Sequence, residues 1–353
     1  MNGKLTLVSM GCHTRLGDVL EYALHELPFD MVTIDELPEV SLRGRRLCFA
    51  LSVDESGVQP DYFRALGYLR AHTGALEDSV GVLLVDGASE QYTKGLARTL
   101  VLAANASGCR FPGRPLVEAT KSLKNFEVLS GVRGIDRFTA YRHTAKSLLS
   151  RLAAYVSPRF EQPQVLLLHA SNPERSNTLA LGRAVAKRLG PSIDTRELTL
   201  AHDAIYDCHG CGYTACVHYA EQESCFYGGL LPESVFPAIQ ACNALLLLCP
   251  NYNDAPSAHF AALLNRLNAL LLRGESLEKD IYAIVVSGYS GSDIVAEQIL
   301  GGFCLNKGFS LPPRFALLET ANDPGEALAL PGVAARLDAF SNGILQSLLK
   351  PAD

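Results

Sequence analysis

The segment VLLLHASNPERSNT, residues 165–178, places an apolar run directly before a loop rich in hydroxyl and amide side chains. A stretch with helical periodicity follows from Leu179 to Leu189. At the start of such a helix, unpaired backbone N–H groups and the helix dipole attract an anion. Residues 171–178 therefore predict a phosphate-binding loop. An ordinary polar turn with an N-cap is the alternative that these residues leave open.

The strand, loop and helix of this segment have a counterpart in the first half of the chain. Residues 5–10 form an apolar run, a loop with Arg15 follows, and residues 18–27 have helical periodicity. The later strands and helices of the two halves also occur in the same order and with similar spacing. This pattern is typical of a tandem duplication.

The strands in both halves are apolar throughout rather than alternating, as Val82–Val85 and Leu245–Leu248 illustrate. Helices should therefore cover both faces of each strand, as in a parallel sheet. The alternation of such strands with helices predicts two tandem α/β domains, each with a doubly wound parallel sheet. We expect one domain over residues 1–157 and another over residues 164–353, joined by a polar stretch with two prolines.

The composition excludes several classes of protein. The 353 residues are 19% charged with a formal net charge of -6, which offers no basic field for nucleic acid. No apolar run approaches the roughly 20 residues of a membrane helix, and the first residues lack a signal-peptide pattern. We expect a cytoplasmic protein, in which the ten cysteines are thiols or metal ligands rather than disulfides.

Three loops of the second half should converge, because doubly wound sheets bind ligands at the carboxyl ends of their strands. These loops span residues 171–178, 249–258 and 287–292. The second half resembles the NAD(P)H-dependent FMN reductase family of the flavodoxin-like superfamily, including its iron–sulfur flavoprotein branch. The resemblance rests on the Asn-Thr end of the first loop, on Pro-x-Tyr in the second and on small residues in the third.

The resemblance implies an FMN-dependent oxidoreductase, reduced by NAD(P)H or by a small electron carrier, with no side chain needed as acid or base. The residues that it implies for the phosphate are Ser171, Arg175, Ser176, Asn177 and Thr178. Those implied beside the flavin ring are Pro250, Asn251, Tyr252 and Asn253, with Ser287, Gly288 and Gly291 completing the site. On the following helix, Arg266 fits the family pattern, but Ala261 replaces its Lys and Asn265 its Asp.

Four cysteines lie just after the second strand of this half, in the spacing C-x2-C-x4-C-x8-C: Cys208, Cys211, Cys216 and Cys225. Four thiolates on one loop meet the basic requirement of a [4Fe-4S] cluster, which the iron–sulfur branch carries at this point with tighter spacing. A zinc site, with His218 as a substitute ligand, and a set of reduced thiols are the alternatives. Cys242, Cys249 and Cys304 lie in or beside apolar segments and are predicted as core residues.

The first half lacks these features. Its loop over residues 11–17 has no Ser-Asn-Thr end, and no segment corresponds to the four cysteines. Asp54 and Glu55 stand where the second half has Pro-x-Tyr, and these acids would repel a phosphate. We expect a degenerate domain that binds no flavin and packs on the second half as an intrachain pseudo-dimer, with a homodimer of the whole chain as a further option.

Two other functions stay open on the sequence. One is an electron-transfer flavoprotein without substrate turnover of its own. The other is a non-catalytic scaffold with a cysteine–metal site and no flavin. Rapid reduction of a bound flavin by NADH or NADPH would favour the enzyme, and a colourless protein would favour the scaffold.

Overall fold

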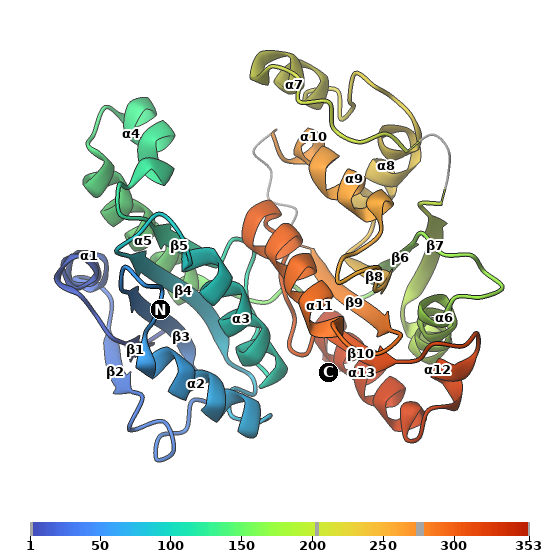
Figure 1. Cartoon of the computed structure of the whole chain (residues 1–353), viewed down its shortest axis with the longest axis horizontal. Coiled ribbons are helices and arrows are strands. Elements are labelled where there is room, and N and C mark those ends of the chain that lie inside the picture. Colours follow the sequence, from blue (N-terminus) through green and yellow to red (C-terminus); the bar gives the residue numbers. More distant parts are fainter. Residues whose placement is uncertain (1–2, 202–204, 273–278, 352–353) are drawn as a thin grey trace. The chain divides into compact units, whose positions relative to one another are not determined.

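The computed structural model describes residues 3–201, 205–272 and 279–351, and it divides into two compact units, residues 1–156 and 157–353 (Figure 1). Each unit is built on one five-stranded sheet with helices on both sides. No helix of the described ranges combines the length and the apolar character needed to cross a membrane.

The elements of the first unit alternate between strands and helices. They are β1 (Leu5–Met10), α1 (Thr14–Leu24), β2 (Phe29–Thr33), β3 (Arg46–Val53), α2 (Pro60–Ala71), β4 (Val80–Gly87), α3 (Thr93–Ala106), β5 (Leu116–Ala119), the short η1 (Lys124–Phe126), α4 (Glu127–Arg133) and α5 (Arg137–Ala154).

The second unit repeats this order and adds helices between its second and third strands. Its elements are β6 (Gln164–His169), α6 (Asn177–Leu189), η2 (Gly190–Ser192), β7 (Asp194–Thr199), α7 (Tyr213–Ala220), η3 (Leu231–Val235), α8 (Phe236–Ala241), β8 (Ala244–Pro250), α9 (Ala258–Arg266), α10 (Asn268–Leu271), β9 (Asp280–Ser287), α11 (Ser292–Ile299), η4 (Leu300–Lys307), β10 (Ala316–Thr320), α12 (Glu326–Ala329) and α13 (Val333–Leu348).

The strand order is the same in the two sheets. It is β2-β1-β3-β4-β5 in the first unit and, read from the corresponding edge, β7-β6-β8-β9-β10 in the second. The strand pairs in both sheets are parallel. This is the 2-1-3-4-5 order of flavodoxin-like sheets. The predicted fold class, two tandem flavodoxin-like doubly wound domains, is confirmed.

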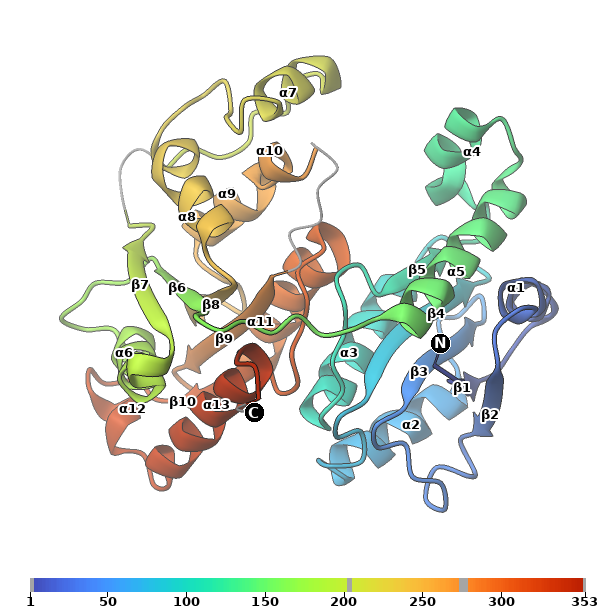
Figure 2. The same cartoon turned by 180° about the vertical axis from the view of Figure 1, so that it is seen from behind.

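Apolar side chains on both faces of the strands explain why helices cover both faces of each sheet (Figures 1 and 2). In the first unit, α1 and α5 bury residues such as Leu16 and Leu149 in the same core as strand residues such as Val82. In the second unit, α6 and α13 bury their apolar faces against the central strands in the same way. The carboxyl ends of the strands stay free of this packing, so the loops there can present polar groups.

Gly182 sets the close approach of α6 to the sheet. A Cβ atom at this position would lie 2.6 Å from Cδ1 of Leu248 on β8. Since real Cβ contacts are longer than this, a larger residue would push the helix away from the strand. The start of α6, and the loop before it, are therefore held close to the end of β6.

Candidate functional site

The three predicted loops lie at one edge of the second sheet. β6, β8 and β9 are neighbours and parallel, so the segments that follow them leave the sheet side by side. We name them the first loop (residues 170–176), the second loop (residues 251–257) and the third loop (residues 288–291). The carboxyl edge of a doubly wound sheet is where ligands bind.

Ser171 in the first loop carries a buried hydroxyl with no hydrogen-bond partner among the residues that the structure describes. Ser176 caps α6 by accepting a hydrogen bond from the Leu179 N–H at 3.2 Å, and its Oγ lies 2.9 Å from Oγ1 of the buried Thr178. A buried hydroxyl left without a partner costs about 1–3 kcal/mol. An oxygen of a bound phosphate at this helix start would satisfy Ser171.

Two other predicted phosphate ligands are placed differently. Arg175 is exposed in the first loop. The Asn177 side chain donates to the Asp323 carbonyl at 2.9 Å and accepts from the N–H groups of Gly325 and Ala327 at 3.0 and 3.2 Å. Its amide therefore anchors the segment before α12, so a contact of Asn177 with phosphate would come from its backbone N–H.

Asn251 connects the second loop to the third. Its Nδ2 donates to Ser287 Oγ at 3.1 Å and to the Ser290 carbonyl at 2.9 Å, while its Oδ1 accepts from the Asp254 N–H at 2.7 Å. Pro250, just before it, ends β8 and is half-buried. The second and third loops are thus held as one unit by a single side chain.

The second loop turns sharply after Tyr252. Tyr252 and Ala255 exchange backbone hydrogen bonds, and Asn253 and Asp254 between them have φ angles of 53° and 59°. Two left-handed residues are typical of a type I′ turn, which favours Asn and Asp. The turn leaves the Tyr252 ring 52% exposed, in a position to contact a planar ligand.

Gly291 in the third loop allows the two loops to approach closely. Its φ is +85°, and a Cβ atom there would lie 2.0 Å from Asp254 Oδ1. Both the backbone angle and the contact require glycine. Gly288 borders Asn322, with 3.2 Å between the position of an added Cβ and Asn322 Oδ1. The predicted residues of these two loops are therefore brought together at the end of β9.

His169, the last residue of β6, supports the first loop and was missed by the sequence analysis. Its Nδ1 accepts from the Ser171 N–H at 3.3 Å, and its Nε2 lies 3.4 Å from Glu197 Oε1. Arg183 donates to both oxygens of Glu197, at 2.9 and 2.7 Å. His169 could have been recognised in the sequence as a polar residue at the end of an apolar run, next to the phosphate loop.

The buried His169 predicts a pH dependence of stability. Burial lowers its pKa from the ordinary value, although the Glu197 charge acts in the opposite direction. The unfolded chain therefore binds the proton more readily, so the stabilising contribution is complete above about pH 6.5 and is lost as the pH falls below that value. Urea unfolding at several pH values should show a shallower decline for His169→Gln than for the parent. Equal slopes would contradict this prediction.

The four cysteines line a single cavity of about 410 Å³ in the second unit. Its wall also contains aromatic rings, among them Tyr219 and Tyr227, and the ring of His209 stacks on Tyr227 at 4.0 Å. Burial raises the pKa of the Cys216 thiol, and the charges of the other three cysteines raise it further. All four thiols therefore lie in one part of the second unit.

The thiols surround the cavity rather than meeting at a point. In the described part of the chain, no group of three or more His, Cys, Asp or Glu side chains is arranged to hold a metal ion. His218, the substitute ligand considered for zinc, is not among the described residues that line the cavity. Cys242, Cys249 and Cys304 are buried.

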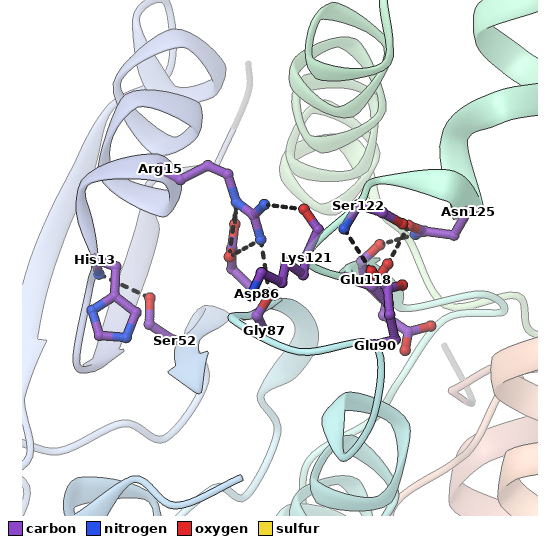
Figure 3. Close-up of polar contacts among 11 residues, drawn as sticks. His13, Arg15, Ser52, Asp86, Gly87, Glu90, Glu118, Lys121, Ser122 and Asn125 are labelled. Atoms are coloured by element: carbon purple, nitrogen blue, oxygen red, sulfur yellow. Dashed lines mark hydrogen bonds and ion pairs between the residues drawn. The ribbon is translucent and has the colours of Figure 1, made fainter. Parts of the chain in front are cut away.

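The corresponding edge of the first sheet is closed by an ion pair (Figure 3). Arg15, in the first turn of α1, donates from Nη2 to Asp86 Oδ1 at 2.6 Å and from Nε to both carboxylate oxygens. It also reaches the carbonyls of Gly87 and Lys121. By strand register, Asp86 takes the position that Val286 has in the second unit.

Further polar contacts fill this edge of the first unit (Figure 3). The His13 N–H donates to Ser52 Oγ at 2.9 Å, and the Ser122 N–H donates to Glu90 at 2.7 Å. The polar groups at the strand ends are thus paired with one another. A buried carboxylate stands where the second unit has the apolar side chain of Val286.

Comparison with known proteins finds a family similarity within the second unit. Residues 163–323 match the family model of NADPH-dependent FMN reductases. The structure of RosB with its bound intermediate 8-demethyl-8-formylriboflavin-5'-phosphate is 18% identical, with 52% of this chain and 80% of that chain covered and a TM-score of 0.39. The apo form of the NADH:FMN oxidoreductase EMOB is 14% identical, with 54% and 91% covered and a TM-score of 0.37. The curated proteins contain no significant match.

The family match has a definite extent along the chain. It begins at β6 and ends before α12, so it includes all three loops and the four cysteines and none of the first unit. The match supports an FMN-dependent oxidoreductase as the class of protein to which the second unit is similar.

Proposed function

We propose that the chain is an FMN-dependent oxidoreductase that takes electrons from NAD(P)H or a small electron carrier. The observation that carries this proposal is the buried, unpartnered hydroxyl of Ser171 in the loop before α6. Phosphate binding at that helix start gives the hydroxyl a partner. The family match over the same residues supports FMN as the source of the phosphate.

The residues of the three loops have separate roles in this proposal. The hydroxyls of Ser171, Ser176 and Thr178 and the backbone N–H groups at the start of α6 bind the phosphate, with Arg175 supplying charge from the exposed side. The joined second and third loops orient the ring, with Tyr252 against it. FMN supplies the electron-transfer chemistry when bound, and the protein supplies position and electrostatics.

The first test is reduction of the bound flavin by a nicotinamide. Anaerobic addition of NADH or NADPH to the purified full chain should bleach the flavin absorbance within seconds, with about one FMN per chain. A chain that binds FMN but is reduced only by a protein or chemical donor would favour the electron-transfer function instead. A colourless chain that binds no added FMN would overturn the proposal.

We infer that the first unit holds no flavin. Its equivalent edge carries the buried Asp86, and a phosphate or a reduced anionic flavin ring there would meet a negative charge. Arg15 is already paired with that carboxylate.

We place the protein in the cytoplasm, as the ten cysteines and a soluble reductase class suggest.

We also propose that the four cysteines bind a metal centre, because all four thiols line one cavity. A polynuclear [4Fe-4S] cluster, in which each thiolate binds a different iron, does not require the four sulfurs to meet at one point. A single zinc ion needs four ligands within about 2.3 Å of one point, and the segment would have to close further to provide them. Zinc therefore stays the second candidate.

Replacing Cys208 with serine should remove most of the bound metal. The change deletes one of four thiolate ligands, whereas Cys242→Ser alters a buried cysteine outside the cavity and should leave the metal content unchanged. Iron, sulfide and zinc analysis of the anaerobically purified proteins measures this. A parent protein with four free thiols in this segment and no metal would contradict the metal proposal but not the flavin proposal.

A further inference from the structure

Arg266 is a buried arginine in the wall of the cysteine cavity. Its side chain lies at the end of α9, and the residue is 2% exposed. Within the described part of the chain it donates to two backbone carbonyls, from Nη1 to Tyr206 at 3.3 Å and from Nη2 to Gly228 at 2.9 Å, and its Nε has no hydrogen-bond partner there. Its charge acts on the nearby Asp207 carboxylate, but no ion pair joins it to a carboxylate among the described residues, so this wall of the cavity can accommodate a further negative charge.

The two carbonyls that Arg266 contacts lie at opposite ends of the cysteine segment. Tyr206 precedes Cys208, and Gly228 follows Cys225, so one guanidinium holds both ends of the stretch that carries all four thiols. Its planar fork of donors suits this double contact better than a lysine would.

The neighbouring Asn265 makes a second connection to the same segment. Its Nδ2 donates to Asp207 Oδ1 at 2.8 Å, and that carboxylate also accepts from the Cys208 N–H at 2.7 Å. These bonds lower the pKa of Asp207, and the bond from Asn265 has the largest effect. An aspartate at 265, which is the residue of the family pattern, would face Asp207 with a like charge.

We propose that Asn265 and Arg266 are positioning residues that close the cysteine segment around the cavity, and that Arg266 compensates the negative charge of the loaded site. Four thiolates leave an excess of negative charge on either a [4Fe-4S] cluster or a divalent ion, and Arg266 lies in the wall of the same cavity. This inference rests on the proposed metal function of the four cysteines, and it assigns to α9 the task of holding them.

The test uses the full-length chain. It compares Asn265→Asp, which sets two carboxylates against each other, with a double variant that exchanges the residues at positions 207 and 265. The probe is Co²⁺ alone, added to metal-free reduced protein under anaerobic conditions and followed by its thiolate absorbance. Asn265→Asp should weaken Co²⁺ binding about tenfold or more, because two carboxylates then face each other. The swap Asp207→Asn with Asn265→Asp restores an amide–carboxylate pair and should return the affinity to within about threefold of the parent.

The charge of Arg266 is tested separately. Arg266→Gln should weaken Co²⁺ binding about tenfold or more. Arg266→Lys keeps the charge but loses the planar fork of donors, so its Co²⁺ affinity should lie between those of the parent and Arg266→Gln. Arg188→Gln is the matched control, since Arg188 pairs with Asp338 on another helix of the same unit and should bind Co²⁺ like the parent. FMN content serves as the check of folding for every variant.

Three results would overturn the inference. The first is parental affinity in both Asn265→Asp and Arg266→Gln, and the second is a swap that fails to recover affinity. The third is a parent chain that binds neither Co²⁺ nor iron, which contradicts the metal function as well. FMN binding by that same parent would leave the flavin proposal standing.

Discussion

Replacing Ser171 and Thr178 together with alanine is expected to weaken FMN binding about a hundredfold or more. Hydrogen bonds to a charged phosphate contribute about 1.5–3 kcal/mol each, and the double change removes two. Ser176 is left intact because its hydroxyl also caps α6. Fluorescence titration of FMN against the apo-protein measures the loss.

Ser171→Ala by itself should leave the chain no less stable than the parent when FMN is absent. Ser171 Oγ has no partner to lose, so its removal relieves a buried unsatisfied group. Ser341→Ala is the matched control, since Ser341 on α13 also has a buried hydroxyl without a partner but lies outside the three loops. Parental FMN affinity in the double variant would show that the phosphate binds elsewhere.

Replacing Arg15 with methionine is expected to destabilise the first unit by about 3–5 kcal/mol, because it leaves a buried carboxylate without its partner. The Asp86 side chain is 4% exposed, and Arg15 satisfies both of its oxygens. Hydrogen exchange of the amides in β1, β3 and β4 reports the free energy of unfolding of this unit separately from the other.

A second change should recover much of that loss. Asp86→Val in the Arg15→Met background removes the stranded charge and introduces the residue that the second unit has at the equivalent position, Val286. The exposed pair of Arg64 and Asp35 is the control, and Arg64→Gln should cost less than about 1 kcal/mol. An Arg15→Met variant as stable as the parent would show that the pair does not hold the edge together.

The fold was predictable because its signals are local and repeated. Continuous apolar strands separated by amphipathic helices specify a parallel sheet whatever the details of the loops, and the repeat showed this twice. The positions of the three loops followed from the same rule, since parallel strands end at one edge. The segment with four cysteines was also recognisable from its spacing.

The contacts within the candidate sites were not predictable in the same way. The Asn177 amide bonds to residues about 150 positions away, near α12, rather than to the first loop. His169 supports Ser171 through its own ring and meets Glu197 on the neighbouring strand. Neither contact leaves a pattern in the sequence, because both depend on the direction in which a side chain leaves its element.

The sequence by itself determined two flavodoxin-like domains, the three loops of the second and the segment with four thiols, because periodicity and residue type fix these. Only the tertiary structure decided that Arg15 closes the first sheet's edge on Asp86 and that Arg266 holds both ends of the cysteine segment. The physical reason is that a buried charge is stabilised by whichever groups the chain brings within hydrogen-bond distance. Strand register and helix packing set those groups, and they join residues that are distant in sequence.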